Sequence, residues 1–77
     1  MIAESILGEI VSVDVTAKTV TIKALKSGNI ETYNTDARVM IKKLGKTITL
    51  TDLTAGNRVT MYRYFLDKKI VTSIYVM

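Results

Sequence analysis

Residues 6–22 read ILGEIVSVDVTAKTVTI and decide the fold of this chain. Their first arm is a long run rich in β-branched residues, and their second arm, from Thr19, alternates polar and apolar residues. This pattern predicts two strands joined by a turn at 16–18. Gly8 and Ser12 leave room for a neighbouring backbone or a bulge, which a strand needs in order to bend between two sheets. A long bent strand shared by two sheets removes the open edges of a small barrel.

The amino-acid composition indicates one all-β domain. Val, Ile and Thr supply 28 of the 77 residues, and β-branched side chains suit a pleated, half-buried surface. No window shows a sustained helical stripe, and the chain has no Pro to interrupt a strand. A chain of this length is near the lower limit for a core without staples, so we expect a single β-barrel domain over 1–77.

The remaining segments predict further strands and one helical turn. Short polar residues at 34–36 are expected to end a strand, because their side chains cap their own backbone. Thr49 suits a helix N-cap, and Asp52 lies where a carboxylate accepts from first-turn amides. Leu50 and Leu53 are then expected to close one end of the barrel. The expected elements are strands at 30–34, 38–43, 58–66 and 70–76, a short extended piece at 47–48 and a helical turn at 49–53.

Together these elements predict a small five- to six-stranded antiparallel OB-like barrel with one short helical turn. Gly56 follows the helical turn and is expected to hold a positive φ. The period of two along each strand predicts the interior side chains. These are Ile10, Val13, Val20, Ile22, Val39, Ile41, Leu53, Val59, Met61, Ile74 and Val76.

The order of turns and core positions also resembles a known family. The matching positions are Gly8-x-Ile10-x-x-Val13-Asp14, Lys18-Thr19-Val20-Thr21-Ile22, Leu50-x-Asp52-Leu53-x-x-Gly56-x-x-Val59 and Val71-x-x-Ile74. They resemble a family of small OB-like β-barrels, domains of unknown function that are common in exported bacterial proteins. Where that family usually has Asp after the late glycine, this chain has Asn57. The resemblance implies a five- or six-stranded barrel and an exported or periplasmic location, and it implies no activity.

Small periplasmic copper chaperones share this barrel size and use His, Met and an aromatic residue as soft ligands. Met40 and Met61 carry thioethers, which suit Cu(I). The chain contains no His, no Cys and no Trp, so this chemistry has too few ligands. We therefore expect Met40 and Met61 to be strand packing residues, and we expect no cofactor.

Two negative expectations concern membranes and export signals. The longest charge-free apolar run, 70–77, is too short for a bilayer, which needs about twenty residues, so no membrane span is expected. Residues 1–4 lack the basic and apolar regions of a signal peptide, so none is expected in this sequence.

A catalytic role is not expected. There is no His to act as a base near neutral pH and no Cys nucleophile. The seven carboxylates are scattered along strands and turns, and their spacing brings no obvious pair together. The chain is therefore predicted not to be an enzyme.

A binding role has more support, because charge and aromatic residues gather in the second half of the chain. Residues 1–37 carry three Lys against five carboxylates (net −2), and residues 38–77 carry eight Lys/Arg against two (net +6). Tyr62-Arg63-Tyr64-Phe65 places aromatic residues beside a cation, although these tyrosines also suit ordinary cross-strand pairing and the lysines a solvated rim. Arg63 inside a barrel would be costly, so the strand is expected to bulge or to leave the barrel near there. The candidate ligand-binding residues are Arg38, Lys42, Lys43, Arg58, Tyr62, Arg63, Tyr64, Lys68 and Lys69.

Two functions from different classes fit these residues. The first is a non-catalytic interaction module of a bacterial envelope or surface system, which binds a protein partner or associates with itself. The alternative is an OB-like protein that binds single-stranded nucleic acid through stacked aromatic rings and a basic groove. The family resemblance favours the first function, and the charge asymmetry favours the second.

Overall fold

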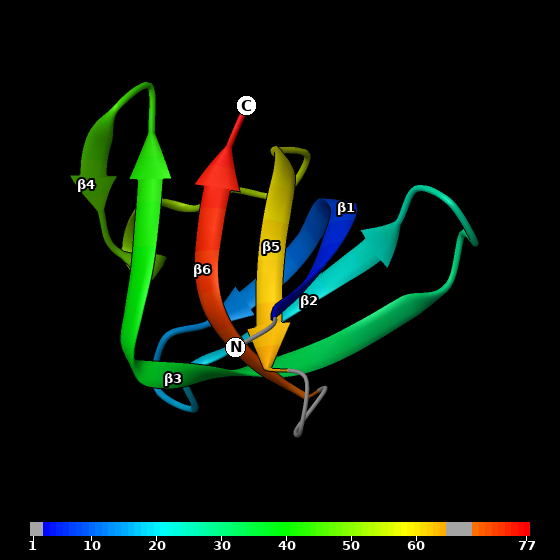
Figure 1. The fold of residues 1–77 in the computed structure, drawn as a ribbon, viewed down its shortest axis with the longest axis horizontal. Coiled ribbons are helices and arrows are strands. Elements are labelled where there is room, and N and C mark those ends of the chain that lie inside the picture. The colour runs from blue at the N-terminus through cyan, green and yellow to red at the C-terminus, as the bar shows by residue number, and fades with distance from the viewer. Residues whose placement is uncertain (1–2, 65–68) are drawn as a thin grey trace.

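The protein folds as a closed five-stranded β-barrel with one extra short strand and a single 3₁₀ turn (Figure 1). The computed structural model describes residues 3–64 and 69–77. The elements are β1 (Ala3–Asp14), β2 (Thr19–Ala24), β3 (Ile30–Lys43), β4 (Lys46–Ile48), the 3₁₀ turn η1 (Leu50–Asp52), β5 (Arg58–Tyr64) and β6 (Ile70–Val76). The predicted fold class is confirmed. The predicted strand positions 65 and 66 lie outside the described residues.

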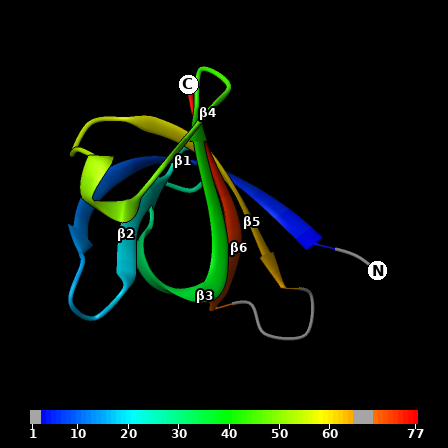
Figure 2. The ribbon, with the colours of Figure 1, turned by 90° about the vertical axis from the view of Figure 1, so that its left-hand side faces the viewer.

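Strand pairing closes the sheet on itself. The strand order is β2-β1-β5-β6-β3-β4, and an additional β2–β3 pairing joins the two sides. The ring therefore runs β1-β2-β3-β6-β5 and back to β1, while β4 adds a short hairpin to β3. Every pairing is antiparallel except β3–β6, which is parallel. Figure 2 looks across the barrel and shows β3 curving from the side of β2 to the side of β6.

The first strand bends between two neighbours, as its sequence predicts. Residues 8–14 of β1 pair with β2, and residues 3–9 pair with β5. The register of the β1–β2 pair shifts between Ile10 and Ser12, which is the expected bulge. A Cβ placed on Gly8 would lie 2.8 Å from Ile22 Cδ1 and 3.1 Å from the Lys23 carbonyl oxygen. A side chain at position 8 would therefore crowd β2, and glycine avoids this contact.

The third strand corrects one expectation. Residues 34–36 do not end a strand, because β3 runs without interruption from Ile30 to Lys43. The Asn34 amide donates to the Lys69 carbonyl oxygen, and the Thr35 amide donates to the Lys18 carbonyl oxygen, so tertiary partners replace the expected local caps. Asp36 still acts locally, since its Oδ1 accepts from the Arg38 amide. The strand kinks at this point instead of ending.

The core fills the barrel with the inward side chains of all five ring strands and Leu53. Most of the predicted interior residues are buried, while Val13 and Val39 are only partly buried against the core. The sequence missed Tyr33 and Val71, which are both buried. Val71 faces inward because the β5–β6 register shifts between Tyr62 and Arg63, which breaks the alternation along β6. The buried residues are Ile10, Val20, Ile22, Tyr33, Ile41, Leu53, Val59, Met61, Val71, Ile74 and Val76.

The 3₁₀ turn closes one end of the barrel as expected. Leu53 is buried and Leu50 packs against the core from outside it. Asp52 Oδ2 accepts from the Thr49 amide at 3.0 Å, so the carboxylate satisfies a backbone donor at the start of the turn. The turn spans only three residues, and it therefore covers only part of this end of the barrel.

Replacing Gly56 by valine is expected to lower the free energy of unfolding by about 1–3 kcal/mol. Gly56 has a φ of +95°, which a β-branched residue adopts only under strain. Nothing lies within 4 Å of a Cβ placed there, so backbone strain is the only cost. Chemical denaturation of G56V beside A55V, a control at the exposed neighbouring position, measures the effect. Equal denaturation midpoints would contradict the assignment.

Candidate binding face

The structure divides seven of the nine predicted site residues among three places. The outer face of β3 and β5 carries Arg38, Lys42, Arg58 and Tyr62. The lower end of the barrel carries Arg63 and Lys69, and the β3–β4 hairpin carries Lys43, whose cross-strand partner is Lys46. The Tyr64 side chain and Lys68 lie outside the described residues. The prediction therefore names residues that do not form one site.

The outer face gains its shape from the register of four neighbouring strands. Met61, Ile74 and Ile41 lie side by side on β5, β6 and β3 and point into the core. Their sequence neighbours must therefore point outward, because successive side chains alternate across a strand. On β1, β5, β6 and β3 they form two rows, namely Leu7, Thr60, Tyr75 and Lys42, and Ser5, Tyr62, Ser73 and Met40.

Large apolar and aromatic side chains cluster on these rows. Leu7, Met40, Tyr62 and Tyr75 are 52%, 46%, 37% and 39% exposed. The rings of Tyr62 and Tyr75 meet edge to face, with centroids 5.7 Å apart and planes at 85°. This geometry is favourable for aromatic pairs and holds both rings in place. We call the surface formed by Leu7, Met40, Tyr62 and Tyr75 the Tyr62–Tyr75 face.

Basic residues surround the Tyr62–Tyr75 face. Lys42 follows Met40 by two residues on β3, and Arg58 lies on β5 opposite Glu9 of β1. Arg38 is exposed and continues the alternation of β3. No ion pair joins these three cations to another residue within 3–64 and 69–77. Because Glu9 faces Arg58, the positive charge beside the face is concentrated on β3, which carries Arg38 and Lys42.

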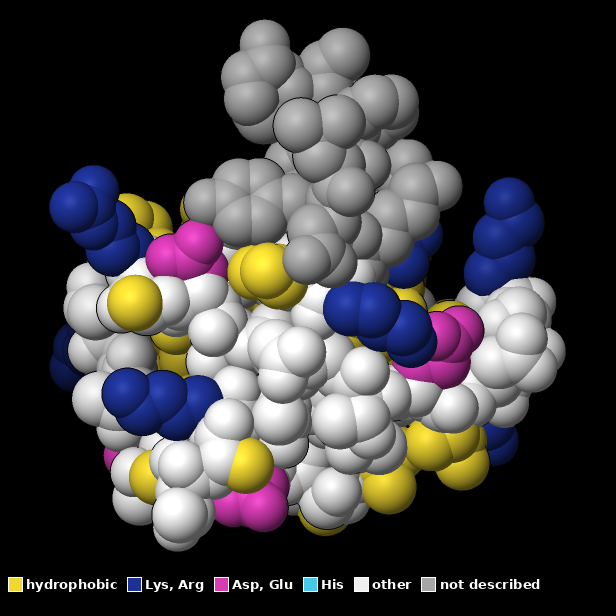
Figure 3. Space-filling model, turned by 90° about the horizontal axis from the view of Figure 1, so that it is seen from below, with side chains coloured by type: hydrophobic (Ala, Val, Ile, Leu, Met, Phe, Trp, Pro, Cys, Tyr) yellow, Lys and Arg dark blue, Asp and Glu magenta, His cyan; other side chains and the backbone are white. Residues whose placement is uncertain are grey.

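The lower end of the barrel shows how Arg63 is accommodated. The β5–β6 register shifts between Tyr62 and Arg63, but the extra residue is Thr72 of β6, so the bulge lies opposite Arg63 and not on its own strand as expected. Its Cζ lies 6.0 Å from the Tyr33 ring centroid, and Nη1 donates to the Tyr33 hydroxyl at 3.5 Å. Lys69 Nζ lies 5.1 Å from the same centroid and contacts Glu31 Oε1 at 2.6 Å. Figure 3 views this end and shows basic and acidic side chains in contact. Tyr33 thus gives both cations an aromatic partner.

The ion pair at this end affects both of its members. The hydrogen bond from Lys69, and then its positive charge, lower the pKa of the Glu31 carboxyl below its usual value. The hydrogen bond to Glu31 raises the pKa of the Lys69 ammonium. Both side chains are solvent-exposed, so the pair contributes little to stability. Lys69 and Arg63 therefore have structural partners of their own in the folded chain.

The sequence prediction missed Tyr75 and Leu7 as surface residues and considered Met40 only as a metal ligand. The signal for Tyr75 was present, because it lies between the inward residues Ile74 and Val76. Its position beside Tyr62 and Lys42 depends on strand pairing, which local alternation does not specify.

The opposite side of the barrel has a different character. On the outer face of β2 and β3 the cross-strand pairs are Thr19–Asn34, Thr21–Thr32 and Lys23–Ile30. The hydroxyls of Thr21 and Thr32 lie 2.7 Å apart and bond to each other. This surface carries mostly small polar side chains and no aromatic ring among these six residues.

The methionines considered as soft-metal ligands lie apart. Met61 of β5 is fully buried in the core, whereas Met40 of β3 is exposed on the outer face of the sheet. Within the described ranges, no three His, Cys, Asp or Glu residues gather closely enough to hold a metal ion. Met61 is a packing residue as expected, and Met40 is a surface residue.

Comparisons with known proteins identify the fold but no family. No family model matches the chain, and no curated protein matches it. Solved structures do match in fold, among them two of CusF. One is a crystal structure of Ag(I)CusF, with a TM-score of 0.74, 12% sequence identity and coverage of 100% of both chains. The other is a Cu(II) structure of a CusF variant from Escherichia coli, with a TM-score of 0.70, 12% identity and coverage of 97% of this chain and 91% of that one.

These matches support the OB-like barrel and leave the predicted family resemblance unconfirmed. At 12% identity, the likeness to CusF shows the fold alone. The only helical element in the described part of the chain is the three-residue η1, so no helix found there is long enough and apolar enough to cross a membrane.

Proposed function

We propose that this protein is a non-catalytic binding module that engages a protein partner through the Tyr62–Tyr75 face. The observation that carries the proposal is the contiguity of four exposed apolar or aromatic side chains across β1, β5, β6 and β3. Contiguous exposed apolar patches on soluble domains mark interaction sites, whereas single exposed hydrophobic residues need no explanation. The partner is another component of an exported envelope or surface system, or a second copy of this chain.

The composition of the face fits a protein interface with an acidic partner. Tyr, Met and Arg are enriched in interface cores, and Tyr62, Tyr75, Met40 and Arg58 supply these types. The T-shaped tyrosine pair is ordered before binding, so little side-chain freedom is lost on association. The cations around the face attract a negatively charged surface and speed its encounter.

A soft-metal role does not fit this chain. The matched structures are of CusF with Ag(I) and of a CusF variant with Cu(II), and thioether and imidazole are suitable donors for such ions. This chain has no His or Cys, and Met40 and Met61 point to opposite faces of the sheet. The two thioethers therefore cannot approach one ion in this fold.

Single-stranded nucleic acid is the second candidate function. Its support is specific, because two exposed tyrosines lie beside Lys42 and Arg58, and bound single strands combine ring stacking with phosphate contacts. OB-folds usually bind oligonucleotides on the face of strands 2 and 3, however, and in this chain the side chains on that face are mostly small and polar. We therefore rank the protein partner first.

The test of the first proposal uses a photo-crosslinking amino acid at Met40, which leaves both tyrosines intact. The matched control carries the probe at Lys23, an exposed position on the opposite face. The Met40 probe is expected to give a discrete protein adduct, in an extract of the source cells if the partner is another protein, or with the purified protein alone if it is a second copy. The Lys23 probe is expected to give none in either experiment. Y75A is expected to weaken this binding about 30-fold or more, as loss of an interface hot spot does. Equal adducts from both probes would overturn the proposal.

The nucleic-acid alternative is decided by titration of a fluorescent oligonucleotide at low salt. If it holds, affinity falls linearly with the logarithm of salt concentration, at about 0.7 per contacted phosphate. Y62A or Y64A would then weaken binding by about 1–3 kcal/mol, and K42A or K43A would lower the salt slope. Absence of saturable binding below about 100 μM would leave the protein partner alone.

A further inference from the structure

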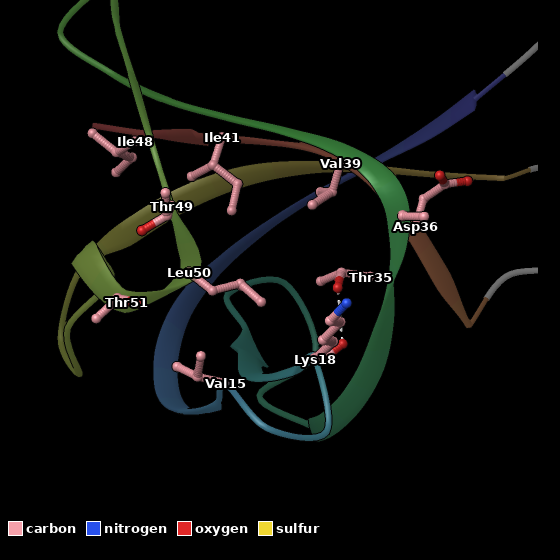
Figure 4. Close-up of a pocket in the computed structure, with 11 residues that line it drawn as sticks. Val15, Lys18, Thr35, Asp36, Val39, Ile41, Ile48, Thr49, Leu50 and Thr51 are labelled. Atoms are coloured by element: carbon pink, nitrogen blue, oxygen red, sulfur yellow. Dashed lines mark hydrogen bonds between the residues drawn. The ribbon is translucent and has the colours of Figure 1, made fainter.

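A hollow of about 410 Å³ opens beside η1, away from the Tyr62–Tyr75 face (Figure 4). It lies between the β1–β2 turn, the kinked part of β3, β4 and η1. Its volume falls within the usual range for small-molecule sites, which is about 300–1,000 Å³. None of the seven predicted site residues whose side chains the structure describes lines it.

The hollow exists because β2 and β4, which pair with the same edge of β3, leave a gap between them in the barrel wall. On one edge of β3, pairing with β2 ends at Asn34, and pairing with β4 begins at Ile41. The Thr35 amide reaches the Lys18 carbonyl oxygen, and then β3 continues to Ile41 without a cross-strand partner on this edge. The three-residue η1 lies across the gap and is too short to fill it.

The interior of the hollow is aliphatic. Side chains from four different elements line it, and those of Val39, Ile41 and Leu50 point toward its centre in Figure 4. They are Val15, Val39, Ile41, Ile48 and Leu50. Such a lining favours a chain of methylene or methyl groups over a flat polar ring, because aliphatic groups gain free energy simply by leaving water.

One cation lies at the rim. Lys18 holds a left-handed conformation with a φ of +58°, and its carbonyl oxygen accepts from both the amide and the hydroxyl of Thr35. These bonds fix the turn that carries the ammonium, and no ion pair of Lys18 occurs within the described ranges. Asp36 also borders the hollow, but its Oδ1 accepts from the Arg38 amide and its carboxylate points away in Figure 4. The rim therefore favours an anion.

We propose that this hollow binds a small carboxylate that carries an aliphatic chain. The chain lies among Val39, Ile41 and Leu50, and the carboxylate meets the Lys18 ammonium at the rim. Two sources offer this chemistry, a free short-chain fatty acid and the carboxyl end of a peptide that finishes in an aliphatic residue. The proposal is independent of the partner proposed for the Tyr62–Tyr75 face.

The test is a titration of the full chain with linear carboxylates from butanoate to octanoate. Shifts of the methyl signals in two-dimensional NMR spectra measure the binding. Each added methylene is expected to tighten binding about fourfold until the hollow is full. The matching amides and alkylamines are expected to bind at least about tenfold more weakly than the carboxylates, because they lose the charge-assisted bond. N-acetyl-leucine, compared with hexanoate, distinguishes the peptide source from the free acid, and binding of either supports the shared chemistry.

Two variants and a control separate the chain from the charge. K18Q is expected to abolish the preference for carboxylate over amide and to keep the dependence on chain length. V15F is expected to weaken every member of the series at least tenfold, since Val15 lines the hollow from a half-exposed position outside the core. K26Q, on the β2–β3 turn, is the control and should change nothing. Equal binding of amines and carboxylates, or no saturable binding of any carboxylate, would overturn the proposal.

Discussion

Replacing Ile74 by alanine is expected to lower the free energy of unfolding by about 2–5 kcal/mol. Ile74 is 0% exposed and lies between Met61 of β5 and Ile41 of β3. Both neighbouring strands are hydrogen-bonded to β6, so the wall of the closed barrel cannot collapse into the cavity that the substitution creates. A chain of 77 residues has a total stability of roughly 4–12 kcal/mol, so I74A would be partly unfolded or close to it.

Urea denaturation followed by far-UV circular dichroism measures this loss. I74V, which removes one methylene, should cost about 0.5–1.5 kcal/mol. M40A is the exposed control on the outer face and should stay within about 0.5 kcal/mol of the parent. If I74A and M40A shared one denaturation midpoint, Ile74 would not be a core residue.

Replacing Gly8 by valine is expected to cost about 3 kcal/mol, at the upper end of the range for overpacking. The first added carbon would lie 2.8 Å from Ile22 Cδ1 and 3.1 Å from the Lys23 carbonyl oxygen. The terminal methyl of Ile22 can rotate away, but the carbonyl belongs to the paired backbone of β2 and cannot. G8A adds only the Cβ and should cost about 1 kcal/mol.

A double-mutant cycle identifies the clash. Ile22→Val removes the methyl that meets the new carbon, so G8A combined with I22V should lose less than the sum of the two single losses. Strict additivity of the two changes would show that Ile22 does not limit the space beside Gly8. The same denaturation measurement serves all four proteins of the cycle.

Local chemistry made much of the fold predictable from sequence. The alternation of 19–22 and of 74–76 specifies which side chains face inward, since side-chain direction in a strand has a period of two. Gly56 and the Thr49–Asp52 turn were predictable for a related reason, because backbone conformation and capping depend on a few adjacent residues. Arg63 was expected to make its strand bulge or leave the barrel, because an unpaired cation is costly in a core, and the β5–β6 register does shift there, although the extra residue lies on β6.

The candidate site was much less predictable, because it depends on which strands become neighbours. The sequence grouped Tyr62 and Arg63 as adjacent residues, yet alternation sends one to the outer face and the other toward Tyr33. Leu7 and Tyr75 come near Tyr62 only because their strands, β1 and β6, both pair with β5. Met40 comes near only because β3 pairs with β6.

By itself, then, the sequence determined the all-β barrel, most of its core and its principal turns. Only the tertiary structure decided that β3 is continuous, that Val71 and Tyr33 are buried, and that a hollow remains beside η1. The reason is that hydrogen-bond register between strands distant in sequence is set by the whole barrel. Asn34 and Thr35 illustrate this, since carbonyl groups of Lys69 and Lys18 accept the amides that local capping would otherwise have satisfied.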